Sequence, residues 1–345
     1  MTRAVRFVQF SGRMTETGRK MFAEPSSVLH CVLAALALLA APSLYAQSYP
    51  ARPIRMIVPF SPAGATDVPA RILGQRLSAA LGQQVIVDNR PGAGSTIGAD
   101  AVAKANPDGY TLLLTATPHV ISASLYRKLP YDAIRDFAPI MQIGSGANVL
   151  AVHPSLPAKS VRALIALATA QPGKIDYASS GNGSAQHLFG ALFLSMAHIR
   201  MMHIPYKGSA PAMTDLISGQ VSVGFPGIAL ALPHTTVGRL RSLAVTDDKR
   251  AKAMPDVPTI DESGVPGYAA TLWLGLLAPK GTPSAIIGRL HDEVARLLKQ
   301  SDVESAFLAT GTDVTISAPD QFGRFLKSEY DKWAKVVKEV GAQEN

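Results

Sequence analysis

The sequence predicts an α/β protein made of two similar units in tandem. Three observations support this fold class. Short apolar runs alternate with amphipathic stretches, Gly, Pro, Asn or Asp separates them, and 47% of the 345 residues are hydrophobic, enough for a sizeable core. Strands that alternate with helices favour mostly parallel sheets covered by helices on both faces.

The first 46 residues are predicted to be a signal peptide. Basic residues precede an apolar run over 28–41, and small residues follow it, so we expect cleavage after Ala46. The run is short for a membrane span, and a retained membrane anchor is the alternative. An internal start at Met14 or Met21 also stays open.

Removal of residues 1–46 would change the net charge and the cysteine content of the chain. Residues 1–46 hold five of the 33 basic residues and two of the 25 acidic ones, so the remainder carries a net charge of about +5. They also hold the only cysteine, Cys31, which excludes disulfides and thiolate metal sites from the mature protein. This net positive charge favours an anionic partner. Because the basic residues form no cluster, we expect no nucleic acid.

The first unit starts directly after the signal peptide. Its expected elements are a strand over 54–60, a helix over 68–81, a strand over 85–88, a helix over 96–104 and a strand over 110–115. Thr66 or Asp67 is the expected N-cap of the first helix, and Gly82 follows its end. Ser95 is the expected N-cap of the second helix.

The second unit repeats this alternation, and two helices follow it. The expected strands cover 149–152, 176–179, 202–205, 221–225 and 240–246, and the expected helices cover 160–170, 185–197, 209–218, 283–300 and 319–340. One apolar stripe on the last helix has helical spacing and is predicted to pack against the core. It consists of Phe322, Phe325, Leu326, Tyr330, Trp333, Val337 and Val340.

Two loops have the composition of an anion site. Val58–Asp67 runs from a strand through small residues into a helix start, and Tyr177–His187 repeats this design with serines, glycines and an asparagine. Free amides and the helix dipole at such a position favour an anion. An ordinary turn with a good cap is the alternative for each loop. The two loops would face each other if the units form a cleft.

A third loop, Asn89–Gly98, superficially resembles a dinucleotide-binding turn. Its glycine spacing differs from the fingerprint and Pro91 interrupts it, so a tight turn is the better interpretation. Nucleophile-elbow, metalloprotease and P-loop motifs are all missing, and the histidines are scattered. We therefore expect no catalytic residue, no metal and no cofactor. A hydrolase using Ser184 and His187 is the enzymatic alternative.

The chain as a whole resembles the Bug-type extracytoplasmic solute receptors of the tripartite tricarboxylate transporter family. The match covers nearly all of the mature chain, and many short segments in the same order carry it. These segments are 49–54, 58–67, 87–94, 107–112, 131–139, 177–187, 203–210, 240–245, 257–259 and 278–283.

This resemblance implies a type II periplasmic binding protein fold, in which two lobes close on a ligand in the cleft between them. It implies a division into residues 47–148 (first part of lobe 1), residues 149–272 (lobe 2) and residues 273–345 (return to lobe 1). The chain would cross between lobes near Val149 and Trp273. The implied partners are a small carboxylate and the membrane subunits of the transporter, and the implied location is the periplasm.

The resemblance also implies ligand-binding residues. They are Phe60, Ser61, Gly64, Ala65, Thr66 and Asp67 in lobe 1, and Ser179, Ser180, Gly181, Gly183, Ser184 and His187 in lobe 2. Among them, Asp67 is expected to cap or organise its loop, because its charge would repel a carboxylate. Lys207, in a turn nearby, is either a ligand contact or a solvated residue.

The chain departs from the family pattern at a few positions, and the ligand stays open among dicarboxylates, tricarboxylates, acidic amino acids and aromatic acids. The segment Val221–Pro226 lacks the acidic residues common there, which favours a less polar acid. An orphan receptor that signals to a membrane sensor is the alternative function, because it would use the same cleft.

Overall fold

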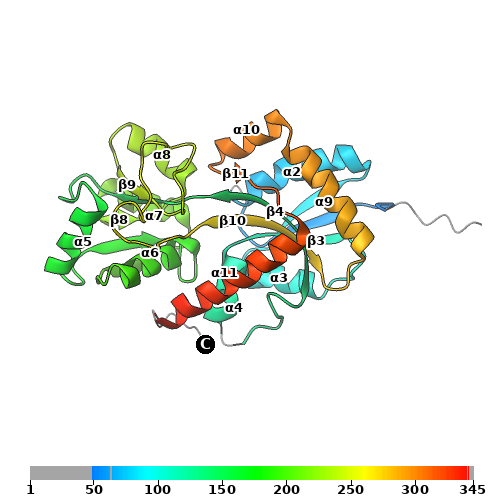
Figure 1. The fold of residues 1–345 in the computed structure, drawn as a ribbon, viewed down its shortest axis with the longest axis horizontal. Coiled ribbons are helices and arrows are strands. Elements are labelled where there is room, and N and C mark those ends of the chain that lie inside the picture. The colour runs from blue at the N-terminus through cyan, green and yellow to red at the C-terminus, as the bar shows by residue number, and fades with distance from the viewer. Residues whose placement is uncertain (1–48, 63, 127, 340, 342–345) are drawn as a thin grey trace, which may run out of the picture. The chain divides into compact units, whose positions relative to one another are not determined.

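Two β-sheets organise the protein in a computed structural model that describes residues 49–62, 64–126, 128–339 and 341 (Figure 1). The predicted signal peptide, residues 1–46, lies outside the described residues, as does Val340 of the apolar stripe. No helix in the described ranges is long and apolar enough to cross a membrane.

The first sheet has six strands in the order β11-β4-β10-β3-β1-β2. Its strands are β1 (Ile54–Val58), β2 (Val85–Asn89), β3 (Thr111–Ala116), β4 (Phe137–Gly146), β10 (Leu272–Pro279) and β11 (Asp313–Val314). Strand β1 pairs in parallel with β2 and β3, whereas β10 is antiparallel to both β3 and β4.

Helices cover both faces of this sheet because alternate strand residues point to opposite sides. The helices are α2 (Asp67–Leu81), the short 3-10 helix η1 (Ala93–Ser95), α3 (Thr96–Ala103), α4 (Pro118–Leu125), α9 (Ser284–Leu298), α10 (Ser301–Ala309) and α11 (Pro319–Glu339). Met56 and Leu112 join the core under α2, α9 and α10, and Ile57 and Leu113 join the core under α3, α4 and α11.

The second sheet has five strands in the order β7-β6-β8-β5-β9. Its elements are β5 (Val149–Val152), α5 (Val161–Ala170), β6 (Asp176–Ser179), α6 (Ala185–Met196), β7 (Met202–Pro205), α7 (Ser209–Ser218), β8 (Val223–Gly224), α8 (Ile228–Thr236) and β9 (Arg241–Val245). Strand β6 is parallel to β7 and β8, and β5 is antiparallel to β8 and β9.

Two chain segments connect the sheets and bond to each other. Strand β4 leads through Ala147 and Asn148 into β5, and residues 246–271 lead from β9 back to β10. The amide of Thr246 donates to Asn148 O over 2.9 Å, and the Asn148 amide donates to the Thr246 hydroxyl over 3.0 Å. The crossing segments are therefore tied together within the described structure.

Helix α11 spans from the first sheet to the second. It packs on α4 and β4, and its Trp333 ring stacks on Phe189 of α6 with centroids 5.6 Å apart. Phe322, Leu326, Trp333 and Val337 are buried, and Phe325 and Tyr330 pack against the same core. The predicted packing of the apolar stripe is confirmed for these residues.

Several elements differ from the sequence expectation. The first strand ends at Val58 rather than at residue 60, and α2 begins at Asp67 with Thr66 at the N-cap position but without a side-chain cap. Strand β4 was not predicted, because Pro139 and three glycines or serines give it a loop-like composition. It is tolerated because Pro139 lies at a register irregularity opposite Leu277.

Candidate functional site

Strand directions bring the two candidate loops to neighbouring ends of the sheets. Strands β1, β2 and β3 run parallel, and β4 runs the same way because β10 is antiparallel to both β3 and β4. They all end where β4 passes into β5. Strands β6 and β8 run opposite to β5 and so end where β5 begins. Ligands of open α/β sheets bind outside the carboxyl ends of their strands.

Loop 1, defined here as residues 59–66, is held from within by Asp67. This residue is only 1% exposed, and its carboxylate accepts from Arg71 Nε over 2.9 Å and from Asn89 Nδ2 over 2.8 Å. The same Asn89 amide donates to Phe60 O over 3.0 Å. These bonds make Asp67 an organiser of the loop from within.

Several amides of loop 1 are available to a ligand. The N–H groups of Ser61, Gly64 and Ala65 make no hydrogen bond to another described residue. Ser61 and Ala65 are exposed, Gly64 is half-buried, and Thr66 is buried at the start of α2. The loop therefore presents unpaired donors at the positive end of a helix of 15 residues.

Loop 2, defined as residues 179–187, has a dense internal network. The buried Ser179 hydroxyl accepts from the Gly181 amide over 3.1 Å and lies 2.6 Å from Nε2 of His203. Ser184 is the N-cap of α6, and its hydroxyl accepts from the His187 amide over 3.2 Å. The capping bond uses one of the two acceptor positions of the Ser184 hydroxyl.

Two glycines shape loop 2. Gly181 has φ of +125° and Gly183 has φ of +72°, conformations that side chains rarely adopt. A Cβ atom on Gly183 would lie 2.4 Å from Cδ2 of Leu125, the last residue of α4. Loop 2 therefore touches a helix of the first sheet, and only glycine fits at this contact.

Histidines in and beside loop 2 are neutral near pH 7. Burial, together with a smaller effect of the neighbouring His203, lowers the pKa of His187 to about 4. Burial likewise lowers the pKa of His203 to about 4. Their rings stack with centroids 4.0 Å apart, and a parallel pair this close would repel if both rings were charged. The loop thus offers neutral donors to an anion.

Cations play little part at the two loops. Arg71 pairs with Asp67, and Lys207 is exposed in the turn after β7, outside every ion pair between described residues.

Ser180 is half-buried and makes no hydrogen bond to a described residue, so its hydroxyl and amide are both available. His203 was not predicted as a site residue, although it lies in a segment that carries the family resemblance.

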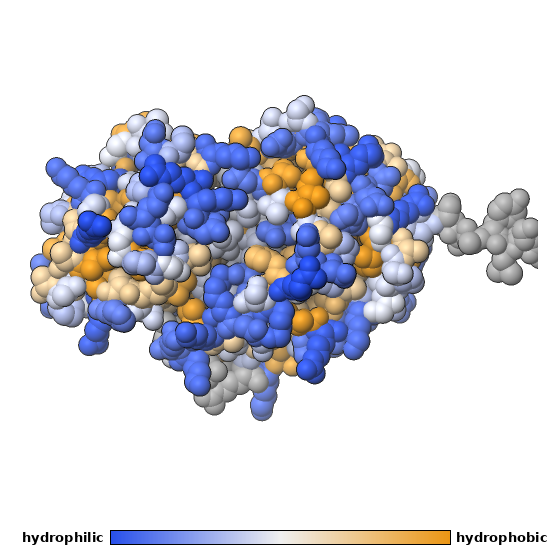
Figure 2. All heavy atoms as spheres, in the orientation of Figure 1, coloured by the Kyte–Doolittle hydropathy of each residue, from blue (hydrophilic) through white to orange (hydrophobic). Residues whose placement is uncertain are grey.

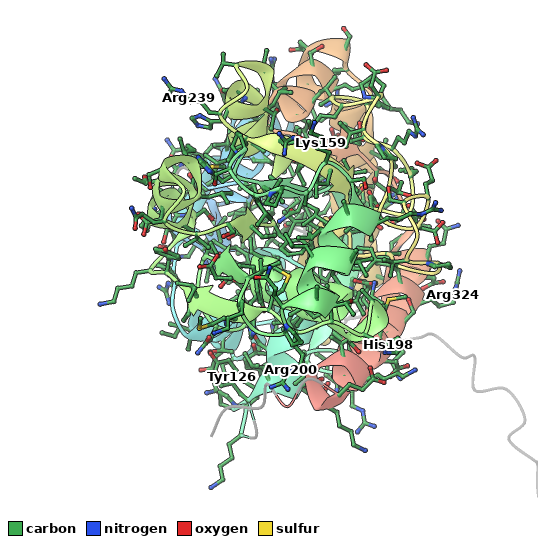
Figure 3. The ribbon with its side chains drawn as sticks, turned by 90° about the vertical axis from the view of Figure 1, so that its left-hand side faces the viewer. Tyr126, Lys159, His198, Arg200, Arg239 and Arg324 are labelled. Carbon is green, nitrogen blue, oxygen red and sulfur yellow. The ribbon has the colours of Figure 1, made fainter. Side chains whose placement is uncertain are left out.

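Two hollows of the described surface lie away from these loops. One of about 520 Å³ adjoins β9 and α8, and another of about 470 Å³ lies over Pro139 and the start of α11. Arg324, which lines the second hollow, lies on the outward side of α11 in Figure 3. In Figure 2 polar and apolar patches alternate on the visible face, in keeping with scattered exposed apolar residues.

Similarity to known proteins agrees with this arrangement. Residues 69–342 match the family described as the tripartite tricarboxylate transporter family receptor. The chain is 42% identical to Protein BugT of Bordetella pertussis over 314 residues, which cover 90% of this chain and 96% of that protein.

Solved structures of similar chains share the fold. Rpa4515 of R. palustris with adipate has a TM-score of 0.77 at 36% identity, covering 85% of this chain and 98% of that one. The periplasmic binding protein BugD has a TM-score of 0.75 at 33% identity, covering 86% and 100%. MatC of Rhodopseudomonas palustris with bound malate has a TM-score of 0.75 at 31% identity, covering 84% and 100%.

These matches confirm the predicted fold class, a two-lobe α/β fold of the periplasmic binding protein type. The matched family and structures are solute-binding receptors rather than enzymes, which agrees with the non-enzymatic prediction and removes support from the hydrolase alternative. The family match covers most of the chain, and the relative matches almost its full length. This chain therefore belongs to the receptor family of the tripartite tricarboxylate transporters.

Proposed function

We propose that this protein is a periplasmic receptor that captures a small carboxylate between loops 1 and 2 and delivers it to the membrane subunits of a tripartite tricarboxylate transporter. The observation that carries the proposal is the placement of two donor-rich loops at neighbouring sheet ends, each at the start of a helix. Unpaired amides at helix starts stabilise anions.

The ligand-binding residues in this proposal are those predicted from the sequence. Loop 1 contributes amides, the Thr66 hydroxyl and contact with Phe60, while Asp67 holds the loop. Loop 2 contributes Ser180 as its freest donor, and Ser179, Gly181, Gly183, Ser184 and His187 form the rest of the surface. The lobes are residues 47–148 with 273–345, and residues 149–272.

We favour a dicarboxylate as ligand. Similar chains have been solved with adipate and with malate, which are both dicarboxylates. Two separate donor loops suit two carboxylate groups, because each loop satisfies one of them without a buried cation. The uncharged segment Val221–Pro226 favours a ligand with a less polar middle, such as adipate, over a hydroxylated one.

Thermal unfolding of residues 47–345 against a panel of about a hundred small acids and neutral metabolites tests the binding role. A ligand that binds only the native state raises the midpoint of unfolding by mass action. We expect a shift with dicarboxylates that Thr66→Ala or Ser180→Ala reduces. A shift with neutral or cationic solutes alone would contradict the anion site.

Matched controls separate lost contacts from lost stability. Thr169→Ala and Ser328→Ala remove exposed hydroxyls whose bonds among the described residues are to carbonyls in their own helices. They should leave the ligand-induced shift unchanged. Delivery is tested by uptake of the labelled ligand in cells with and without the receptor. Uptake that does not depend on the receptor would favour the sensory alternative.

Export is part of the same proposal. We infer that residues 1–46 are removed during secretion and that the mature chain begins at Gln47. Mass spectrometry of the protein recovered from the periplasmic fraction measures its first residue. A first residue before Val28 would instead support a retained anchor.

A further inference from the structure

His203 lies outside the two loops, on strand β7, yet it contacts both ends of loop 2. Its Nε2 lies 2.6 Å from the hydroxyl of Ser179, the first residue of the loop. Its ring stacks on His187, the last residue of the loop, at 4.0 Å and 6°. Tyr177 also stacks on His203, at 4.9 Å and 26°. Two rings cannot occupy one face, so His203 lies between them.

When Nε2 of His203 carries the ring proton, the Ser179 hydroxyl uses all of its hydrogen-bonding positions. The hydroxyl then accepts from His203 and from the Gly181 amide at 3.1 Å, and it donates to Gly181 O at 3.2 Å. A hydroxyl has one donor and two acceptor positions, so this arrangement uses all of them. The Ser179 hydroxyl therefore links the imidazole of His203 to the backbone of Gly181.

The protonation of His187 follows from its own contact. The Gly183 amide donates to Nδ1 of His187 over 3.2 Å, so Nδ1 carries no proton. Burial keeps the ring neutral near pH 7 by lowering its pKa to about 4, and the ring proton is then on Nε2. This N–H has no hydrogen-bond partner among the described residues, which leaves it for a ligand.

We propose that His203 is a positioning residue for carboxylate capture: it holds Ser179 and His187 at the two ends of loop 2, so that the loop donors and the Nε2–H group of His187 are in place before the ligand arrives. This inference rests on the proposed function. It predicts that His203 controls affinity although it does not touch the ligand.

Calorimetric titration of residues 47–345 with adipate and with malate tests the positioning role. His203→Phe keeps an aromatic ring but loses the bond to Ser179, and Ser179→Ala loses the same bond together with the two bonds to Gly181. Each should weaken binding roughly tenfold, the effect of one buried hydrogen bond. The double variant should bind no more weakly than Ser179→Ala, because Ser179→Ala already removes the bond that His203→Phe removes.

Two further variants complete the comparison. His203→Gln keeps a nitrogen donor at the position of Nε2 and should bind more tightly than His203→Phe. His153→Phe removes a similar histidine–serine bond, His153 to Ser155 at 2.7 Å, far from loop 2 along the sheet, and should bind like the wild type. Full additivity of the two single effects, or unchanged binding by His203→Phe, would overturn the proposal.

A readout without ligand separates this inference from the proposed function. The ¹⁵N shifts of the His187 ring report which nitrogen carries the proton. The wild type should show a proton on Nε2, and His203→Phe should show a mixture of tautomers because loop 2 loosens. An unchanged His187 spectrum in His203→Phe refutes the positioning role. If no acid binds the wild type while the spectrum changes as expected, only the proposed function fails.

Discussion

Glu329 connects helix α11 to the crossing strand β10, and its replacement should measurably destabilise the protein. The residue is 5% exposed, and its Oε2 accepts from the indole nitrogen of Trp273 over 3.2 Å and of Trp333 over 3.0 Å. Its other oxygen forms an ion pair with Lys332. Glu329→Ala leaves two buried indole N–H groups without an acceptor, while Lys332 can turn to solvent.

The size of the effect follows from these contacts. A buried donor left unpaired costs about 1–3 kcal/mol, so two of them cost about 4 kcal/mol, within the range for breaking a buried charged pair. For roughly 290 described residues, the entropy of unfolding is about 0.6 kcal/mol per degree at the midpoint. The midpoint of thermal unfolding should therefore fall by about 6–7 °C.

Calorimetry with tryptophan fluorescence measures this loss. The chain contains two tryptophans, and both bond to Glu329, so emission reports directly on the site. Asp331→Ala on the same helix is the matched control, because Asp331 is exposed and pairs with Lys327 at the surface. It should cost less than about 1 kcal/mol. Equal shifts for the two variants would refute the reasoning.

Three further predictions concern glycine, histidine and threonine positions. Gly173 and Gly183 share φ near +73°, but only at Gly183 would a Cβ atom collide with Leu125. In urea unfolding, Gly173→Ala should therefore reduce the free energy of unfolding by about 1 kcal/mol and Gly183→Ala by at least about 2 kcal/mol. Buried His119 has its pKa lowered from 6.5 to about 4 by desolvation, so the unfolded state binds more protons between these values. His119 should contribute a loss of stability of up to about 3 kcal/mol as pH drops from 6.5 to 4, in addition to the losses from His187 and His203. His119→Gln should make the dependence shallower by that amount, and an unchanged slope would contradict it. The Thr117 hydroxyl bridges a carbonyl and an amide of the crossing segment, so Thr117→Val should cost about 2 kcal/mol, and a change below about 0.5 kcal/mol would show the bridge to be dispensable.

The element order was largely predictable because it depends on local patterns. Apolar runs of five or six residues, such as 111–116, and capping residues, such as Ser160 with its bond to the Ala163 amide, identify strands and helices without their partners. Strand β4 was missed because its stability comes from pairing with β10, more than a hundred residues away, rather than from its own composition. Helix α10 was missed because it follows α9 after only two residues.

The candidate loops were identified by the same local reasoning, and their ligand contacts stay a prediction. Serine and glycine between a strand and a helix indicate free amides wherever the helix lies. The role of His203 could not be read in this way. Its bond to Ser179 joins residues 24 positions apart and exists only because β6 and β7 pair in parallel.

The sequence by itself determined most of the segments that become strands and helices, and it identified the family, because both depend on residue types in fixed order. Tertiary structure alone decided which loop ends meet, that Asp67 faces inward to Arg71 and Asn89, and that His203 lies between Tyr177 and His187. The physical reason is that these contacts depend on strand pairing and burial. Both arise from residues far apart in the chain, and no local pattern encodes their distances.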